Sequence, residues 1–137
     1  MKLYHWLLSL LILAMSFQAF SLEKQTSTHF EKQAFTKELF DKYQSEGVVT
    51  LIDVFAKWCP TCAKQQEVLN AYFQENPTSK IKVLVVDYDT QKEWVKYFEA
   101  PRQSSLYIYA KGKKEWFSVA ETRKNEIFAL LKKWETP

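Results

Sequence analysis

The chain has 137 residues, a length typical of one domain, and its net charge of +3 argues against nucleic-acid binding. Hydrophobic residues make up 47% of the chain and aromatic residues 16%, a composition that excludes intrinsic disorder. The chain has only two glycines, which excludes collagen-like proteins and glycine-rich phosphate-binding loops as well.

The first 21 residues have the pattern of a secretory signal peptide. Lys2 provides a short positive region, an apolar run follows over 6–17, and small residues stand before the expected cleavage site. The alternative is an uncleaved membrane anchor, but the run is shorter than the about 20 residues of a membrane span. We therefore expect a signal peptide or anchor over 1–21, a leader over 22–29 and a folded domain over 30–137.

Strand and helix patterns alternate through the first half of the domain. A short strand is expected over 30–35, followed by a helix that runs to residue 46, with Thr36 as its N-cap and Gly47 at its end. Residues 48–56 are apolar almost throughout and rich in β-branched side chains. Such a run is typical of a strand that is buried on both faces of its sheet.

The middle of the chain predicts a helix, a strand and another helix. Pro60 suits the first turn of the first of these helices, which ends at 76–77. A second buried strand is expected over 81–86. Thr90 and Glu93 have the spacing of a capping box, which predicts where the next helix begins.

The last part of the chain predicts a β-hairpin and a final helix. Pro101 ends the preceding helix, and strands over 105–109 and 115–119 flank a turn at 111–113. Apolar residues at helical spacing define an amphipathic last helix: Ile127, Leu130, Leu131 and Trp134. The predicted class is therefore α/β, with a central mixed β-sheet flanked by helices on both faces.

The only two cysteines of the chain stand in the segment Trp58-Cys59-Pro60-Thr61-Cys62, where a buried strand meets a helix. At a helix N-terminus, free N–H groups and the helix dipole stabilise a thiolate at Cys59, and a thiolate is the nucleophile of disulfide exchange. Cys62 lies one turn further along and can attack the mixed disulfide. The pair predicts a redox cycle that requires no cofactor.

A cysteine pair at this spacing can also serve other roles. A structural disulfide would add little stability because it closes a very short loop. Zinc normally takes four ligands, and outside the first 21 residues His29 is the only histidine, so no zinc or other resident metal is expected. A redox-silent interaction domain does not explain an intact Cys-x-x-Cys pair. Cu(I) binding by the two thiolates stays open, as in a metallochaperone or metal-site assembly factor.

The segment 51–62 resembles the active-site segment of thioredoxin-like proteins, and the likeness covers roughly 30–134. This resemblance implies a thioredoxin-like fold, thiol-disulfide oxidoreductase activity and a redox-active disulfide between Cys59 and Cys62. The pentapeptide 58–62 is also similar to that of periplasmic cytochrome c maturation (TlpA-like) thioredoxins, which act as reductants. As an exported protein the chain is expected in the periplasm, or anchored to the inner membrane facing the periplasm. There we expect a monomer that reacts with client proteins and receives electrons from a membrane thiol donor.

The resemblance also assigns roles to residues around the cysteines. Asp53 matches the buried acid of thioredoxins, which relays protons to and from the inner cysteine, and burial raises the pKa of such a carboxyl toward neutrality. Trp58, Pro60 and Thr61 are expected to form part of the surface that clients meet. Strong oxidants carry a histidine between the cysteines, so the uncharged Thr61 favours a reductase.

The sequence departs from the thioredoxin pattern at three positions. Ser104 stands where the family has a cis-proline that faces the cysteines, and its loop, including Gln103, is expected to contact clients. Because a non-proline cis bond costs about 3–4 kcal/mol, the Gln103–Ser104 bond is expected to be trans. Without the proline, the family's mode of client binding and its exclusion of metals are both in question. Val85 replaces the lysine that partners the buried acid, and Glu67 replaces the helix-kinking proline.

Overall fold

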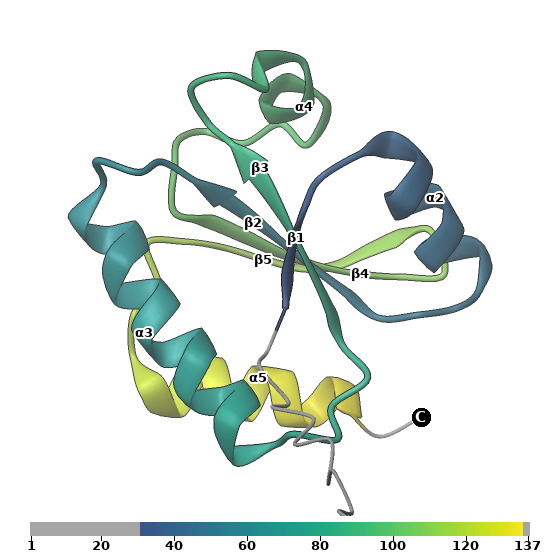
Figure 1. The fold of residues 1–137 in the computed structure, drawn as a ribbon, viewed down its shortest axis with the longest axis vertical. Helices are drawn as coiled ribbons and strands as arrows, with labels where there is room; N and C mark the ends of the chain where they lie inside the picture. Colours follow the sequence, from purple (N-terminus) through teal and green to yellow (C-terminus); the bar gives the residue numbers. More distant parts are fainter. Residues whose placement is uncertain (1–30, 136–137) are drawn as a thin grey trace, which may run out of the picture.

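The computed structural model describes residues 31–135, so the predicted signal peptide or anchor and the leader lie outside the described residues. No helix in the described range is long and apolar enough to cross a membrane. The predicted order of strands and helices is confirmed (Figure 1). In chain order the elements are β1 (Lys32–Ala34), α2 (Lys37–Ser45), β2 (Thr50–Phe55), α3 (Pro60–Glu75), β3 (Lys82–Asp87), α4 (Lys92–Tyr97), β4 (Ser105–Ala110), β5 (Lys113–Val119) and α5 (Lys124–Glu135).

The five strands form one mixed sheet in the order β1-β3-β2-β4-β5. β1, β3 and β2 run parallel, and β4 and β5 form the predicted antiparallel hairpin beside β2. In this register Asp53 on β2 lies between Val85 on β3 and Leu106 on β4. β2 is therefore central, which explains why its sequence is apolar on both faces.

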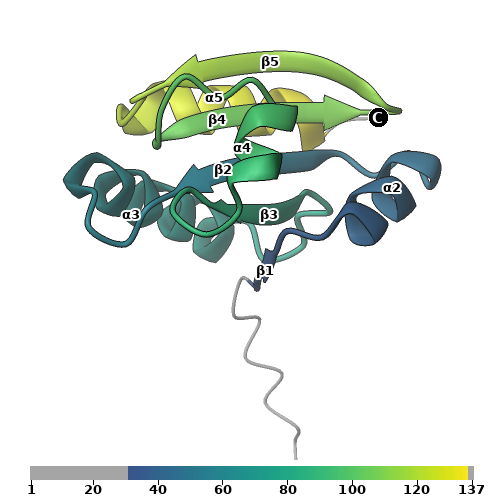
Figure 2. The same cartoon turned by 90° about the horizontal axis from the view of Figure 1, so that it is seen from above.

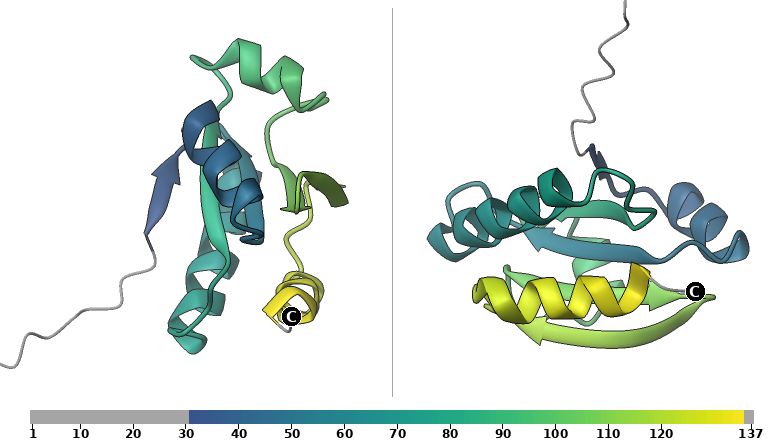
Figure 3. Two further views of the ribbon diagram at one scale, coloured as in Figure 1. Left: turned by 90° about the vertical axis from the view of Figure 1, so that its right-hand side faces the viewer. Right: turned by 90° about the horizontal axis from the view of Figure 1, so that it is seen from below.

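Helices cover both faces of the sheet, as predicted (Figures 2 and 3). α3 and α5 pack on one face, and the core there includes Leu51, Leu69, Ile108, Ile127 and Leu131. α2 and α4 pack on the other face over a largely aromatic core that includes Phe35, Phe40, Ile52, Phe98 and Tyr107. Neighbouring residues of β2 and β4 alternate between these two cores, as the two-residue period of a strand requires.

The predicted ends of α2 are confirmed, but the predicted start of α4 is wrong. The Thr36 hydroxyl accepts the N–H of Leu39 at the start of α2, and Gly47 with φ +71° follows its end. α4 has Gln91 as its N-cap, with no side-chain capping bond, so the capping box predicted from Thr90 and Glu93 does not form.

Other hydrogen bonds explain the difference at α4. The Asp87 carboxylate accepts the N–H of Thr90, and the Gln91 side chain accepts the N–H of Asp87 and donates to the carbonyl of Phe35. The turn is therefore organised by two local bonds of Asp87 and by one long-range bond to Phe35 instead of by a capping box. The helix also ends at Tyr97, well before the predicted stop at Pro101.

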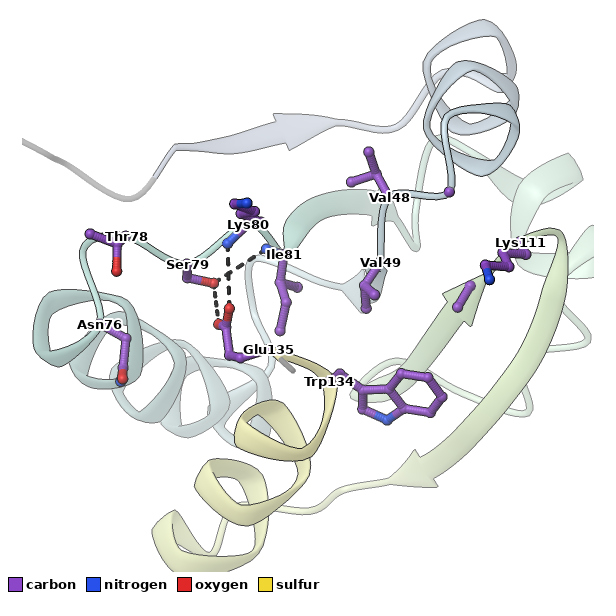
Figure 4. A pocket seen from close by; sticks show the side chains of 12 residues that line it. Val48, Val49, Asn76, Thr78, Ser79, Lys80, Ile81, Lys111, Trp134 and Glu135 are labelled. Carbon is purple, nitrogen blue, oxygen red and sulfur yellow. Dashed lines mark hydrogen bonds between the residues drawn. The ribbon is translucent and has the colours of Figure 1, made fainter. Parts of the chain in front are cut away.

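A pocket of about 700 Å³ lies at the end of the fold away from the cysteines (Figure 4). Val48, Val49, Ile81 and Trp134 provide apolar walls, and the carboxylate of Glu135 accepts a hydrogen bond from the hydroxyl of Ser79 on one side. The pocket adjoins the C-terminal end of α3, whereas the cysteines lie at the N-terminal end of this 16-residue helix, about 24 Å away.

Candidate active site

The two cysteines occupy the positions that the sequence predicts. Cys59 is the N-cap of α3 in an extended conformation, Pro60 is the first helical residue, and Cys62 lies in the first turn. The Cys59 sulfur accepts the N–H of Cys62 at 3.1 Å, so it satisfies one of the free donors of the helix end. Cys59 is 3% exposed and Cys62 is fully buried. Of the two cysteines, only Cys59 therefore retains any exposed surface.

The surroundings of the two sulfurs make their acidities unequal. Burial alone would raise the pKa of Cys59, but hydrogen bonds from the Cys62 thiol, the Ser104 hydroxyl and the N–H groups of Cys62 and Thr61 outweigh it and lower the pKa. Burial and the neighbouring Cys59 raise the pKa of Cys62. The site can thus hold one thiolate beside one thiol, with the negative charge on Cys59.

Ser104 faces both sulfurs, as predicted. Its Oγ lies 3.2 Å from Cys59 Sγ and 3.1 Å from Cys62 Sγ, and the residue is fully buried. No cis peptide bond occurs within residues 31–135, which confirms the trans Gln103–Ser104 bond. The N–H of Ser104 donates to the carbonyl of Val54 at 2.8 Å, so it is already used within the fold.

Asp53 is fully buried on the face of β2 that α3 covers. The side-chain amide of Gln66 on α3 donates to Asp53 Oδ2 at 2.5 Å, and Oδ1 has no hydrogen-bond partner among the described residues. Burial raises the pKa of Asp53 to about 6, although Gln66 and the charge of Lys32 act to lower it. A carboxyl that titrates near neutrality, with one free oxygen, has the properties of a proton acceptor.

Lys32 is a residue that the sequence analysis missed. Val85 does pair with Asp53, which confirms that the neighbouring strand carries no lysine at this position. The ammonium of Lys32 on β1 instead donates to the side-chain oxygen of Gln66, which in turn binds Asp53. Burial lowers the pKa of Lys32, and the Asp53 charge opposes that shift. The position of Gln66, one helical turn after Cys62, was the only sequence signal for this network.

The other predicted client-binding residues differ in how far they are exposed to solvent. Trp58 is 61% exposed, and its indole N–H donates to the carboxylate of Asp89 at 2.8 Å, which holds the ring beside the cysteine segment. Pro60 is exposed, whereas Thr61 and Gln103 are half-buried. Their role in client binding stays a prediction.

Comparison with known proteins identifies the family. Residues 26–133 match the model of the thioredoxin family. The chain belongs to the thioredoxin family. A crystal structure of Trxlp from Edwardsiella tarda is 30% identical, covers 74% of this chain and 98% of its own, and superposes with a TM-score of 0.70. Thioredoxin from Malassezia sympodialis, at 18% identity, shares the fold over 77% of this chain and 94% of its own, with a TM-score of 0.67. The predicted thioredoxin-like fold is thus confirmed.

One relative of this chain is the thiol:disulfide interchange protein DsbE of Haemophilus influenzae. It is 30% identical over 87 residues, which cover 61% of this chain and 44% of the relative. The chain therefore spans less than half the length of that protein. Membership of the thioredoxin family and the paired cysteines support thiol-disulfide oxidoreductase activity.

Proposed function

We propose that this thioredoxin-family protein is an exported thiol-disulfide oxidoreductase that reduces disulfides of specific client proteins. The observation that carries the proposal is the unequal pair of sulfurs at the start of α3. Cys59 accepts an N–H from the helix end and has a lowered pKa, whereas Cys62 is fully buried and has a raised pKa. This asymmetry assigns attack to Cys59 and release to Cys62.

The reaction proceeds in two balanced steps. The Cys59 thiolate attacks one sulfur of the client disulfide, a mixed disulfide forms, and the first client thiolate leaves. Cys62 then gives its proton to the Asp53 carboxylate and attacks the Cys59 sulfur, which releases the second client thiolate. The client gains two electrons, and the protein is left with a Cys59–Cys62 disulfide. A thiol donor at the membrane then restores the dithiol.

The direction of electron flow is inferred from the groups around Cys59. The groups that lower its pKa are neutral hydrogen-bond donors, and the residue between the cysteines, Thr61, carries no charge. Strongly oxidising dithiol proteins are oxidants because their reduced form is stabilised. A thiolate stabilised without a cation therefore supports a reductase.

The reduction potential tests this direction. Equilibration with defined mixtures of reduced and oxidised glutathione, read by mass spectrometry of alkylated thiols, is expected to place the couple nearer to about −270 mV than to about −120 mV. A value above about −150 mV would contradict the proposal and make the protein an oxidant of its clients.

Export and partners belong to the same proposal. The positive residue, apolar run and small residues of the first 21 positions support transport to the periplasm, with an uncleaved anchor in the inner membrane as the alternative. The thiol chemistry calls for client proteins with disulfides and for a membrane electron donor. We expect the protein to act as a monomer.

Cu(I) transport is the second candidate function, and the serine beside the sulfurs is the observation that favours it. Ser104 adds a hydroxyl near Cys59 and Cys62, where a proline ring would occupy the space. Residues 31–135 contain no cluster of three or more histidine, cysteine or acidic side chains, so a metal there would depend on the two sulfurs.

The variant Ser104→Ala, which lacks the hydroxyl but keeps the backbone N–H that binds Val54, separates these two functions. For a reductase, we expect the substitution to change which client disulfides react, and the reduced wild type to lose Cu(I) to a competing chelator. A wild type that retains Cu(I), together with a Ser104→Ala variant that binds it more weakly, would establish the metal carrier instead. Cu(I) titration of both proteins beside a disulfide-reductase assay provides the measurement.

A further inference from the structure

The Ser104 hydroxyl takes no part in the exchange steps of Cys59, Cys62 and Asp53, yet it lies beside both sulfurs. It lies within hydrogen-bond distance of both sulfurs, at 3.2 Å from Cys59 and 3.1 Å from Cys62, and all three residues are buried. A hydroxyl has one proton to donate and two lone pairs to accept with. A thiolate at Cys59 can only accept, so in the reduced protein the hydroxyl donates its proton to Cys59.

The backbone of Ser104 holds the hydroxyl in this place. The N–H donates to the carbonyl of Val54 at 2.8 Å, and the carbonyl accepts the N–H of Ala120 at 2.8 Å and the side-chain amide of Gln65 at 3.2 Å. These bonds fix a non-glycine residue at φ +63°, a conformation that L-residues rarely adopt. Three separate parts of the chain therefore hold the Ser104 backbone in one conformation. This conformation places the Ser104 side chain against the two sulfurs.

We propose that Ser104 is a catalytic residue of the exchange reaction, whose hydroxyl stabilises the dithiol form and so sets the reduction potential of the cysteine pair. The inference rests on the proposed oxidoreductase function. In the reduced protein the hydroxyl donates to the Cys59 thiolate. In the disulfide form Cys59 carries no charge, so a charge-assisted hydrogen bond is replaced by a weaker one. Ser104 thus favours the reduced form and makes the couple less reducing than it would be without the hydroxyl.

Two substitutions remove the hydroxyl in different ways. Ser104→Gly suits φ +63° without strain, because glycine populates this region freely. Ser104→Ala retains the β-carbon, so comparison with Ser104→Gly separates the loss of the hydroxyl from the loss of the whole side chain. Ser105→Ala is the matched control, since Ser105 is the next residue, buried at the start of β4, and its hydroxyl donates to the carbonyl of Arg102 at 2.7 Å.

Equilibration with glutathione measures the effect on the couple. Loss of one hydrogen bond to a charged group is expected to shift the equilibrium about tenfold toward the disulfide in both Ser104 variants, which corresponds to a potential about 30 mV lower. The Ser105→Ala control is expected to keep the wild-type equilibrium. Circular dichroism checks that each variant is folded.

Alkylation of Cys59 at neutral pH provides an independent measurement. Without the hydroxyl, the thiolate form of Cys59 is expected to be about tenfold less populated, but a more basic sulfur is also more nucleophilic. The two effects together predict an alkylation rate about threefold lower in both Ser104 variants. The assignment would be overturned if Ser104→Gly and Ser104→Ala had the same glutathione equilibrium and alkylation rate as the wild type. It would also be overturned if Ser105→Ala shifted the glutathione equilibrium as much as the Ser104 variants do. A wild type that reduces no protein disulfide would instead refute the proposed function, because the alkylation rates report on Ser104 without any client.

Discussion

Cys59→Ser is expected to abolish disulfide exchange completely, whereas Cys62→Ser is expected to trap clients as stable mixed disulfides. The difference follows from position, because Cys59 has the lowered pKa and the only measurable exposure, and Cys62 is enclosed one turn behind it. Without Cys59 no nucleophile reaches the client. Without Cys62 the first step still occurs, but nothing attacks the mixed disulfide.

Non-reducing electrophoresis and mass spectrometry of each variant after exposure to oxidised client proteins measure this difference. The two single variants control for one another, since each retains one sulfur of the same pair. In the reduced wild type, alkylation is expected to modify Cys59 before Cys62. Client adducts on the Cys59→Ser variant, or preferential labelling of Cys62, would reverse the assigned roles.

Asp53→Asn is expected to stabilise the folded protein at high pH while slowing the exchange reaction. Burial raises the pKa of Asp53 from 3.8 to about 6, so the folded state binds its proton more tightly than the unfolded state does. The stability that the protonated carboxyl contributes is complete below the unfolded pKa and is lost as pH rises through about 6. A shift of about two pKa units corresponds to about 3 kcal/mol at about pH 8, which asparagine would recover.

Denaturant unfolding of wild type and Asp53→Asn tests the sign as well as the size of this effect. The stability gain is expected to fall below about 1 kcal/mol at about pH 4, where the carboxyl is protonated in the folded state. Lys32→Met is the matched comparison, because removing the nearby positive charge leaves the buried carboxylate less stabilised and shifts stability at high pH in the opposite direction. If Asp53→Asn and wild type were equally stable at both pH values, the ionised Asp53 carboxylate would not destabilise the folded protein.

The same variant tests the proposed proton transfer. With no carboxylate to accept the proton of Cys62, release of the client from the mixed disulfide is expected to be slower near neutral pH, and its dependence on pH around about 6 is expected to disappear. Stopped-flow measurement of client release across this range gives the profile. An Asp53→Asn profile that matches wild type would reduce Asp53 to a structural residue.

Where the sequence predicted wrongly or incompletely, contacts with distant parts of the chain take part. The capping box at Thr90 and Glu93 has the right local spacing, but Thr90 and Gln91 instead bond to Asp87, and the Gln91 side chain also binds the carbonyl of Phe35 from before α2. Lys32 belongs to the edge strand β1, which adjoins β3 and not β2. Nothing in its neighbourhood in the sequence indicates that it reaches Gln66 on α3.

By itself the sequence determined the fold class, the order of the elements and the placement of Cys59 and Cys62, because alternation, helical spacing and a proline after Cys59 act over a few residues. Only the tertiary structure decided which polar groups meet the sulfurs and the buried acid. The Ser104 hydroxyl reaches both cysteines since β2, α3 and the segment after β5 together hold its backbone at φ +63°. Such contacts depend on the packing of segments far apart in the chain, and no local pattern encodes them.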